Sequence, residues 1–160
     1  MYQPGDRPLD DRHWKRLNRF ANMAFAKRRW DEAERLYGAA LYEANRLFEI
    51  AQAGGVMRCD PAPMLVVATT NAAENWIVLG RCEDAGKAIA GLSRRLVEVV
   101  DDMESPPDFR RQCLVHLKGA VRSLTSVLPR AGWSSDAVVA QVMEVRSAAL
   151  RAMDPSPPRY

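Results

Sequence analysis

Hydrophobic residues recur along most of the chain at spacings of three and four residues, which is the period of an α-helix. The clearest stretch lies between Asp31 and Gly54. Nine of its positions share one helical face: Ala33, Leu36, Tyr37, Ala40, Leu41, Ala44, Leu47, Phe48 and Ala51. The acidic pair Asp31-Glu32 suits a helix N-terminus, and Gly54-Gly55 suits a helix end, so the pattern predicts one long helix here.

Similar start and stop signals divide the rest of the chain. Asp10 or Asp11 can cap a first helix, Asp60-Pro61 opens a third, and Ser134 or Ser135 caps a sixth. The run Val66–Thr70 has strand propensity, but its neighbours are helical and no partner strand exists, so we interpret it as helix. The pattern therefore predicts an all-α fold with helices at about 10–28, 31–51, 61–79, 83–103, 107–128 and 134–153.

One helical domain is expected over residues 10–153, preceded by an N-terminal arm at 1–9. The proline-rich segment 154–160 cannot continue a helix and is interpreted as a disordered tail. A chain of 160 residues, 48% hydrophobic, is long enough to bury one sizeable core.

Small and large residues alternate where two antiparallel helices would interlock. In the first two helices the small ones are Ala21, Ala24, Ala33 and Ala40, and the large ones are Phe20, Phe25, Trp30 and Tyr37. The segment 71–89 echoes this pattern: Ala73 matches Ala21, Trp76 matches Ala24, Ala85 matches Ala33 and Ile89 matches Tyr37. Ala33 and Ala85 are 52 residues apart. A third copy around 117–150 keeps Gly132 and Ala137 but has Gln141 at the large position.

This arrangement resembles the tetratricopeptide (TPR) superfamily, closely over about 14–44, moderately over 69–92 and weakly thereafter. The spacing exceeds the roughly 34 residues of the standard repeat, and the long second helix and the following loop absorb the excess. The resemblance implies three antiparallel helical hairpins stacked as a short right-handed superhelix. The alternative is an ordinary helical bundle whose Ala-rich hairpins look repeat-like.

Charge and cysteine content narrow the class of protein. The net charge is only +3, and the basic runs at 27–29, 94–95 and 110–111 are whole helices apart, which argues against nucleic-acid binding as the function. Cys59, Cys82 and Cys113 form no metal-binding pair, which favours reduced thiols. Without a signal-peptide core or a spanning apolar run, we expect a cytoplasmic protein with no membrane association. The excess of Arg over Lys is compatible with a bacterial source.

Residues that could carry catalysis are few. His13 and His116 have no evident carboxylate or cysteine partner, and no glycine-rich phosphate loop is present. We therefore expect no enzyme activity, no cofactor and no metal site.

The resemblance implies instead that the first helix of each hairpin lines a concave groove that holds a peptide. Carried onto this chain, the groove residues are Lys15, Asn18, Arg19, Asn22, Phe25, Thr70, Asn71, Glu74, Lys118 and Arg122. Asn22 and Asn71 stand where many peptide-binding members carry asparagine, whose carboxamide both donates to and accepts from a peptide backbone. Lys118 and Arg122, four residues apart, resemble part of a clamp for a C-terminal carboxylate.

Two features depart from that clamp: Asn18 stands where lysine is usual, and Glu74 adds a negative charge. Without a groove ligand, the two asparagines would serve hairpin packing, and Lys118 and Arg122 would form a solvated face. A separate patch of Ile50, Val56 and Met57 would support a homodimer if it stays exposed.

From the predicted groove, the expected function is an adaptor or chaperone that binds a protein or peptide partner, similar in size to three-repeat bacterial secretion chaperones. The alternative is a structural homo-oligomeric subunit without a peptide ligand.

Overall fold

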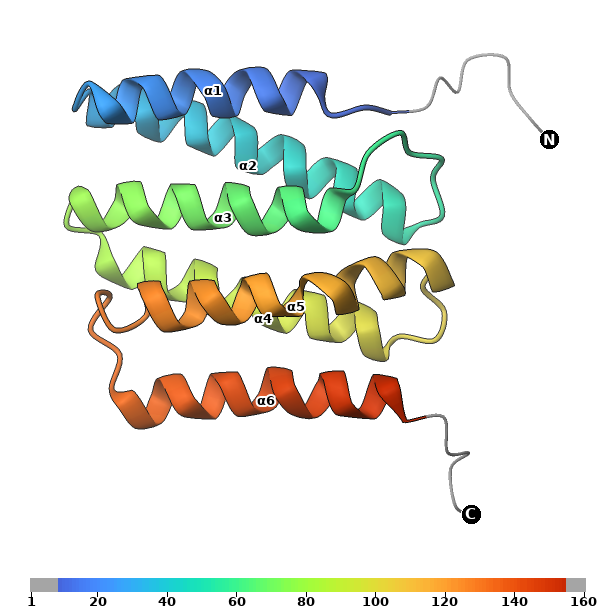
Figure 1. Ribbon diagram of the computed structural model, residues 1–160. Coiled ribbons are helices and arrows are strands. Elements are labelled where there is room, and N and C mark those ends of the chain that lie inside the picture. The colour runs from blue at the N-terminus through green and yellow to red at the C-terminus, as the bar shows by residue number, and fades with distance from the viewer. Residues whose placement is uncertain (1–8, 155–160) are drawn as a thin grey trace.

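The computed structural model describes residues 9–154, and in this range the protein is all-α with six helices (Figure 1). The bounds are α1 Arg12–Ala26, α2 Trp30–Gln52, α3 Pro61–Val78, α4 Cys82–Asp101, α5 Pro107–Val127 and α6 Ser135–Met153. The predicted all-α class is confirmed, and the expected helices are all present with ends shifted by about two residues or fewer. Most of the predicted arm and tail, residues 1–8 and 155–160, lie outside the described residues.

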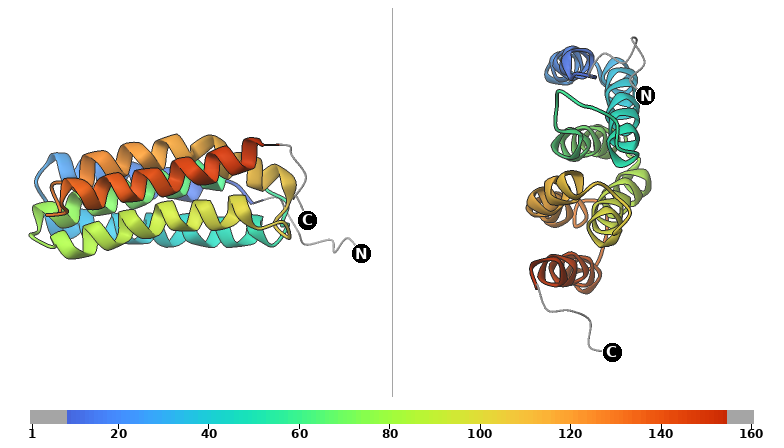
Figure 2. Two further views of the ribbon diagram at one scale, coloured as in Figure 1. Left: turned by 90° about the horizontal axis from the view of Figure 1, so that it is seen from below. Right: turned by 90° about the vertical axis from the view of Figure 1, so that its right-hand side faces the viewer.

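The helices lie side by side in an elongated stack (Figures 1 and 2). Seen along the helices, α1, α3 and α5 form one layer, while α2 and α4 form the other (Figure 2). Each helix packs on its neighbour in sequence, and α3 also packs on α5. At the end of the stack, α6 contacts both α4 and α5. The layer of α1, α3 and α5 is therefore the one that displays the predicted groove residues.

The turns that follow α1, α3 and α5 are built alike. Each contains a residue in the left-handed backbone region: Arg28 (φ 56°), Gly80 (φ 77°) and Gly132 (φ 89°). The next residue donates its N–H to a carbonyl five residues back, at 2.9 Å for Arg29, 2.7 Å for Arg81 and 3.0 Å for Trp133. These turns recur every 52 residues, so the spacing of Ala33 and Ala85 extends to the last pair of helices. A left-handed residue with such a backbone bond is how helices commonly end.

The core forms where small residues of one helix admit large residues of another. Ala21, Ala33, Ala73 and Ala85 are all fully buried. The two matched large residues, Tyr37 and Ile89, are 4% and 0% exposed. These small residues and the large residues Tyr37 and Ile89 are therefore packing positions, as predicted. Phe20, which was expected to interlock with them, is 44% exposed and lies outside the core. Burial of a side chain such as Ile89 stabilises the fold by about 1.5–3 kcal/mol.

The patch suggested for a homodimer at the end of α2 is not formed. Val56 is 73% exposed, but Ile50 and Met57 are half-buried. The loop is held against the N-terminal segment, since Leu9 and Met57 form a parallel bridge and Arg58 donates its N–H to the Leu9 carbonyl at 2.7 Å. Of the three apolar side chains, only Val56 is therefore exposed.

Only some of the N-cap hydrogen bonds predicted from the sequence are formed. Ser134 caps α6 as expected, its Oγ accepting the Ala137 N–H at 3.2 Å. Asp11 and Asp60 occupy the N-cap positions of α1 and α3 without making a side-chain cap bond, but Asp10 Oδ1 accepts the N–H of Arg12, the first residue of α1, at 3.2 Å. Asp11 forms an ion pair with Lys15 at 2.7 Å, and Asp60 accepts from the Gln112 amide at 3.1 Å. These carboxylates therefore serve side-chain contacts, one within α1 and one from the start of α3 to α5.

Candidate functional site

Two equivalent side-chain hydrogen bonds connect the helices of the layer formed by α1, α3 and α5. Asn71 Nδ2 on α3 donates to Asn18 Oδ1 on α1 at 3.0 Å. The hydroxyls of Thr70 on α3 and Ser123 on α5 lie 2.7 Å apart. Because Asn18 and Thr70, like Asn71 and Ser123, are 52 positions apart, the same contact is made twice along the stack. Three of the predicted groove residues, Asn18, Thr70 and Asn71, thus also set the register between helices.

Four predicted residues meet in one shallow pocket of about 360 Å³ between α1 and α3. Asn22 and Phe25 come from α1, Asn71 and Glu74 come from α3, and Tyr37 of α2 completes the lining. The Tyr37 hydroxyl donates to Asn22 Oδ1 at 2.7 Å. Burial raises the pKa of Tyr37, which keeps this hydroxyl protonated as a donor. The Phe25 ring lies edge-on to Tyr37, with centroids 6.2 Å apart, and fixes the pocket wall.

The two asparagines present complementary hydrogen-bonding groups. Oδ1 of Asn22 accepts from Tyr37, which leaves its amide Nδ2 to donate. Nδ2 of Asn71 donates to Asn18, which leaves its Oδ1 to accept. One donor and one acceptor on adjacent helices match the C=O and N–H of a peptide group. Asn22 is exposed and Asn71 half-buried, so both are reachable from solvent.

The negative charge at Glu74 is balanced by a residue that the sequence did not indicate. Arg130, just after α5, approaches both carboxylate oxygens of Glu74 at 2.7 Å. The two residues are 56 positions apart, and no local pattern links them. Glu74 is therefore an ion-paired side chain at the pocket edge.

The remaining α1 residues line a second, more open depression of about 430 Å³ along the same helix. Lys15, Asn18, Arg19 and Asn22 lie in it together with Trp14, Met23 and Ala26. The Arg19 guanidinium lies 5.3 Å from the centroid of the Phe20 ring. This depression shares Asn22 with the pocket described above, so the two are continuous along α1.

The two cations on α5 do not join this pocket. Lys118 and Arg122 are both exposed, as a shared face predicts. Lys118, however, lines a groove between α5 and α6. Neither cation lines the pocket that contains Asn22 and Asn71, and a carboxylate clamp that uses these residues stays a prediction. Across residues 9–154, no group of three or more metal-ligating side chains comes together.

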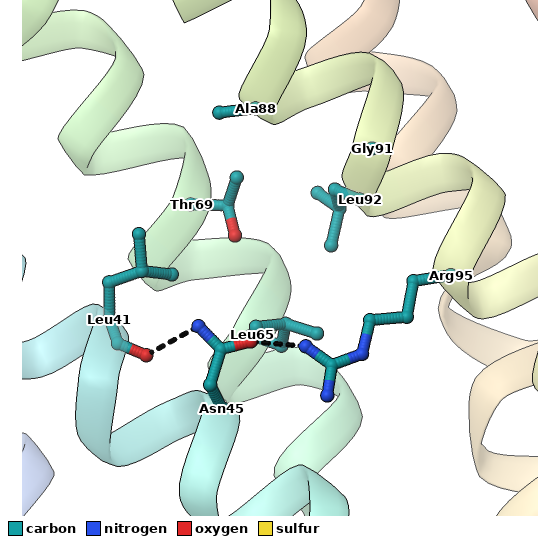
Figure 3. Close-up of a pocket in the computed structure, with 8 residues that line it drawn as sticks. All are labelled: Leu41, Asn45, Leu65, Thr69, Ala88, Gly91, Leu92 and Arg95. Carbon is teal, nitrogen blue, oxygen red and sulfur yellow. Dashed lines mark hydrogen bonds between the residues drawn. The ribbon is translucent and has the colours of Figure 1, made fainter. Parts of the chain in front are cut away.

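A further pocket of about 210 Å³ opens on the other layer, between α2, α3 and α4 (Figure 3). Its polar edge is made of Asn45 and Arg95, which sequence reasoning missed. Asn45 donates to the Leu41 carbonyl at 2.9 Å and accepts from Arg95 (Figure 3). The Arg95 guanidinium also lies 4.5 Å from the Phe48 ring centroid and 3.5 Å from Glu49. These groups satisfy one another, which identifies them as a link between α2 and α4.

The fold and the α1–α3 pocket define an all-α protein of stacked helix pairs with an open carboxamide-lined face. Within the described residues, no helix is both long and apolar enough to cross a membrane. A family model described as a protein of unknown function (DUF2753) matches residues 12–154, so the chain belongs to that family. No curated protein and no solved structure matches the chain.

Proposed function

We propose that this protein is a cytoplasmic adaptor or chaperone whose α1–α3 face holds an extended segment of a partner protein. In this proposal the three helix pairs form a short TPR-like right-handed superhelix, and the layer of α1, α3 and α5 is its ligand-binding face. The 52-residue recurrence of the left-handed turns supports a stack of equivalent units.

The observation that carries the proposal is the paired orientation of Asn22 and Asn71. Tyr37 and Asn18 each use one end of a carboxamide, and the opposite ends then offer a donor and an acceptor across adjacent helices. A main-chain peptide group supplies both partners without regard to side chain. Such a site suits recognition of an unfolded or extended segment rather than one small metabolite.

Side-chain preference would come from the surroundings of the two asparagines. Phe25 gives the pocket an apolar wall, and Arg19 adds positive charge along α1, whereas Lys15 is paired with Asp11. Glu74 contributes little net charge because Arg130 pairs with it. The proposal therefore expects segments with one apolar residue followed by acidic ones to bind best.

An array of immobilised decapeptides of varied sequence, probed with the purified protein, tests this function. Binding peptides are expected to carry an apolar residue next to an acidic stretch, and Asn22→Ala with Asn71→Ala should weaken them at least tenfold. The control is Arg35→Ala with Glu98→Ala on exposed positions of α2 and α4, which should bind as wild type. If the asparagine double variant bound unchanged, the assignment of this face would be wrong.

A further inference from the structure

An open apolar groove runs between α5 and α6 at the end of the stack. It has a volume of about 490 Å³. Its floor includes Leu114 and Val121 of α5 with Val142 and Ala149 of α6, and Lys118 and Arg146 lie along it. The four apolar residues are only partly buried. This surface is separate from the α1–α3 pocket and does not depend on the function proposed for it.

The equivalent groove of the preceding helix pair is filled. The positions 52 residues before Leu114, Val142 and Ala149 are Ala62, Ala90 and Val97, which are 0%, 5% and 8% exposed. They lie on α3 and α4, and α5 packs against both of these helices. Gln112 of α5 also accepts the Ala62 N–H at 2.8 Å. The first pair behaves likewise, since α3 packs on α2 and is bonded to α1 through Asn71 and Asn18.

The exposed face of α6 extends this open surface. Val139, Met143 and Leu150 are 58%, 50% and 59% exposed, and Met153 at the groove end is 67% exposed. Their spacing of three, four and seven residues puts them on one side of the helix beside Val142 and Ala149. An apolar strip of this extent on the last helix of a stack marks an interaction surface.

Charge determines which helix fits the groove. Its two charged lining residues, Lys118 and Arg146, are both cations, and no carboxylate lines it. Neither cation forms an ion pair within the described part of the chain. In a second copy packed through α6, Arg146 of one chain would face the equally basic groove of the other. A helix that carries carboxylates beside its apolar stripe would instead pair with both cations.

We propose that the α5–α6 groove binds an amphipathic helix of a partner protein, with an apolar stripe flanked by Asp or Glu, running antiparallel to α6. The helix takes the place that α5 takes on α3 and α4. Its apolar stripe covers Leu114, Val121, Val142 and Ala149, and its carboxylates contact Lys118 and Arg146.

The probe is a fluorescent synthetic 18-residue peptide with Leu and Ala at helical spacing and Glu on both flanks. The matched peptide has Lys in place of every Glu. Anisotropy titration is expected to show saturable binding of the Glu peptide and at least tenfold weaker binding of the Lys peptide. Lys118→Glu with Arg146→Glu should reverse this preference. Arg35→Glu with Arg94→Glu, on exposed positions of α2 and α4, should leave it unchanged.

The proposal would be overturned if the Glu peptide showed no saturable binding to the wild-type protein. It would also be overturned if the Lys118→Glu, Arg146→Glu variant preferred the same peptide as the Arg35→Glu, Arg94→Glu control. A third result would also overturn it: light scattering that shows the protein alone to be a dimer, and Leu150→Glu to be a monomer. The occupant of the groove would then be a second copy of this chain. Circular dichroism of each variant must match wild type, which ensures that lost binding is not lost folding. Hydrogen exchange must protect α5 and α6 rather than α1 and α3, which separates this site from the α1–α3 pocket.

Discussion

The hydroxyl of Tyr37 on α2 lies 2.7 Å from Oδ1 of Asn22 on α1, and this bond fixes the carboxamide at the centre of the candidate site. Tyr37→Phe removes the donor while keeping the ring, so the free energy of unfolding should fall by about 0.5–1.5 kcal/mol. Urea unfolding measures this loss. Tyr42→Phe is the matched control. Tyr42 is 73% exposed, so loss of its hydroxyl should leave the free energy of unfolding unchanged. Equal behaviour of the two variants would show that the Tyr37 bond contributes nothing.

Gly86 on α4 leaves space for the ring of Trp133 at the start of the last helix pair. A Cβ at position 86 would lie 2.6 Å from the Trp133 Nε1, and the rigid ring would have to move. We therefore expect Gly86→Ala to lower the free energy of unfolding by about 1–3 kcal/mol. Gly91→Ala on the same helix has nothing within 4 Å and should raise stability by about 0.5–1 kcal/mol. Urea unfolding of both variants measures the difference, and effects of the same sign would contradict it.

Arg28 holds the left-handed conformation (φ 56°) that glycine holds at positions 80 and 132. A side chain in this region costs about 1–2 kcal/mol, and glycine is free of that strain. Arg28→Gly should therefore raise the free energy of unfolding by roughly 1 kcal/mol despite the added chain entropy. Gly80→Ala should lower it by a similar amount. Thermal and urea unfolding measure both changes, and a less stable Arg28→Gly would show that Arg28 makes a contact worth more than its strain.

The buried thiol of Cys113 contributes to a loss of stability at alkaline pH. Burial raises the pKa of its thiol to about 12 from an ordinary value of 9.0. The unfolded chain therefore loses this proton first, so the stabilising contribution is complete below pH 9 and declines between about pH 9 and 12. The decline is up to about 1.4 kcal/mol per pH unit. Cys113→Ala should flatten the fall in unfolding free energy above pH 9. Equal slopes of unfolding free energy against pH for wild type and Cys113→Ala would contradict this.

Much of the helical layout follows from local patterns. Apolar residues at helical spacing indicate the helices themselves. Their ends are marked by local signals whose effects are confined to a few residues: Asp60-Pro61, Gly54-Gly55 and Gly80. Ala33 with Tyr37 and Ala85 with Ile89 predict the packing positions, since both pairs are buried in the structure.

The candidate site depends on relations that such patterns do not contain. Lys118 and Arg122 share a helical face, as their spacing predicts, but the rotation of α5 about its axis decides which groove Lys118 lines. The pair of Glu74 with Arg130 and the bond of Tyr37 to Asn22 each depend on the register between separate helices. The apolar face of α6 becomes evident only once the preceding grooves are seen to be filled.

Backbone amide NMR of the protein titrated with the strongest decapeptide from the array tests the central claim most directly. The account predicts shift changes concentrated on α1 and α3, with the side-chain amide signals of Asn22 and Asn71 among the largest. Shift changes confined to α5 and α6, or spread evenly over both layers, would contradict the claim that the α1–α3 face holds the partner segment.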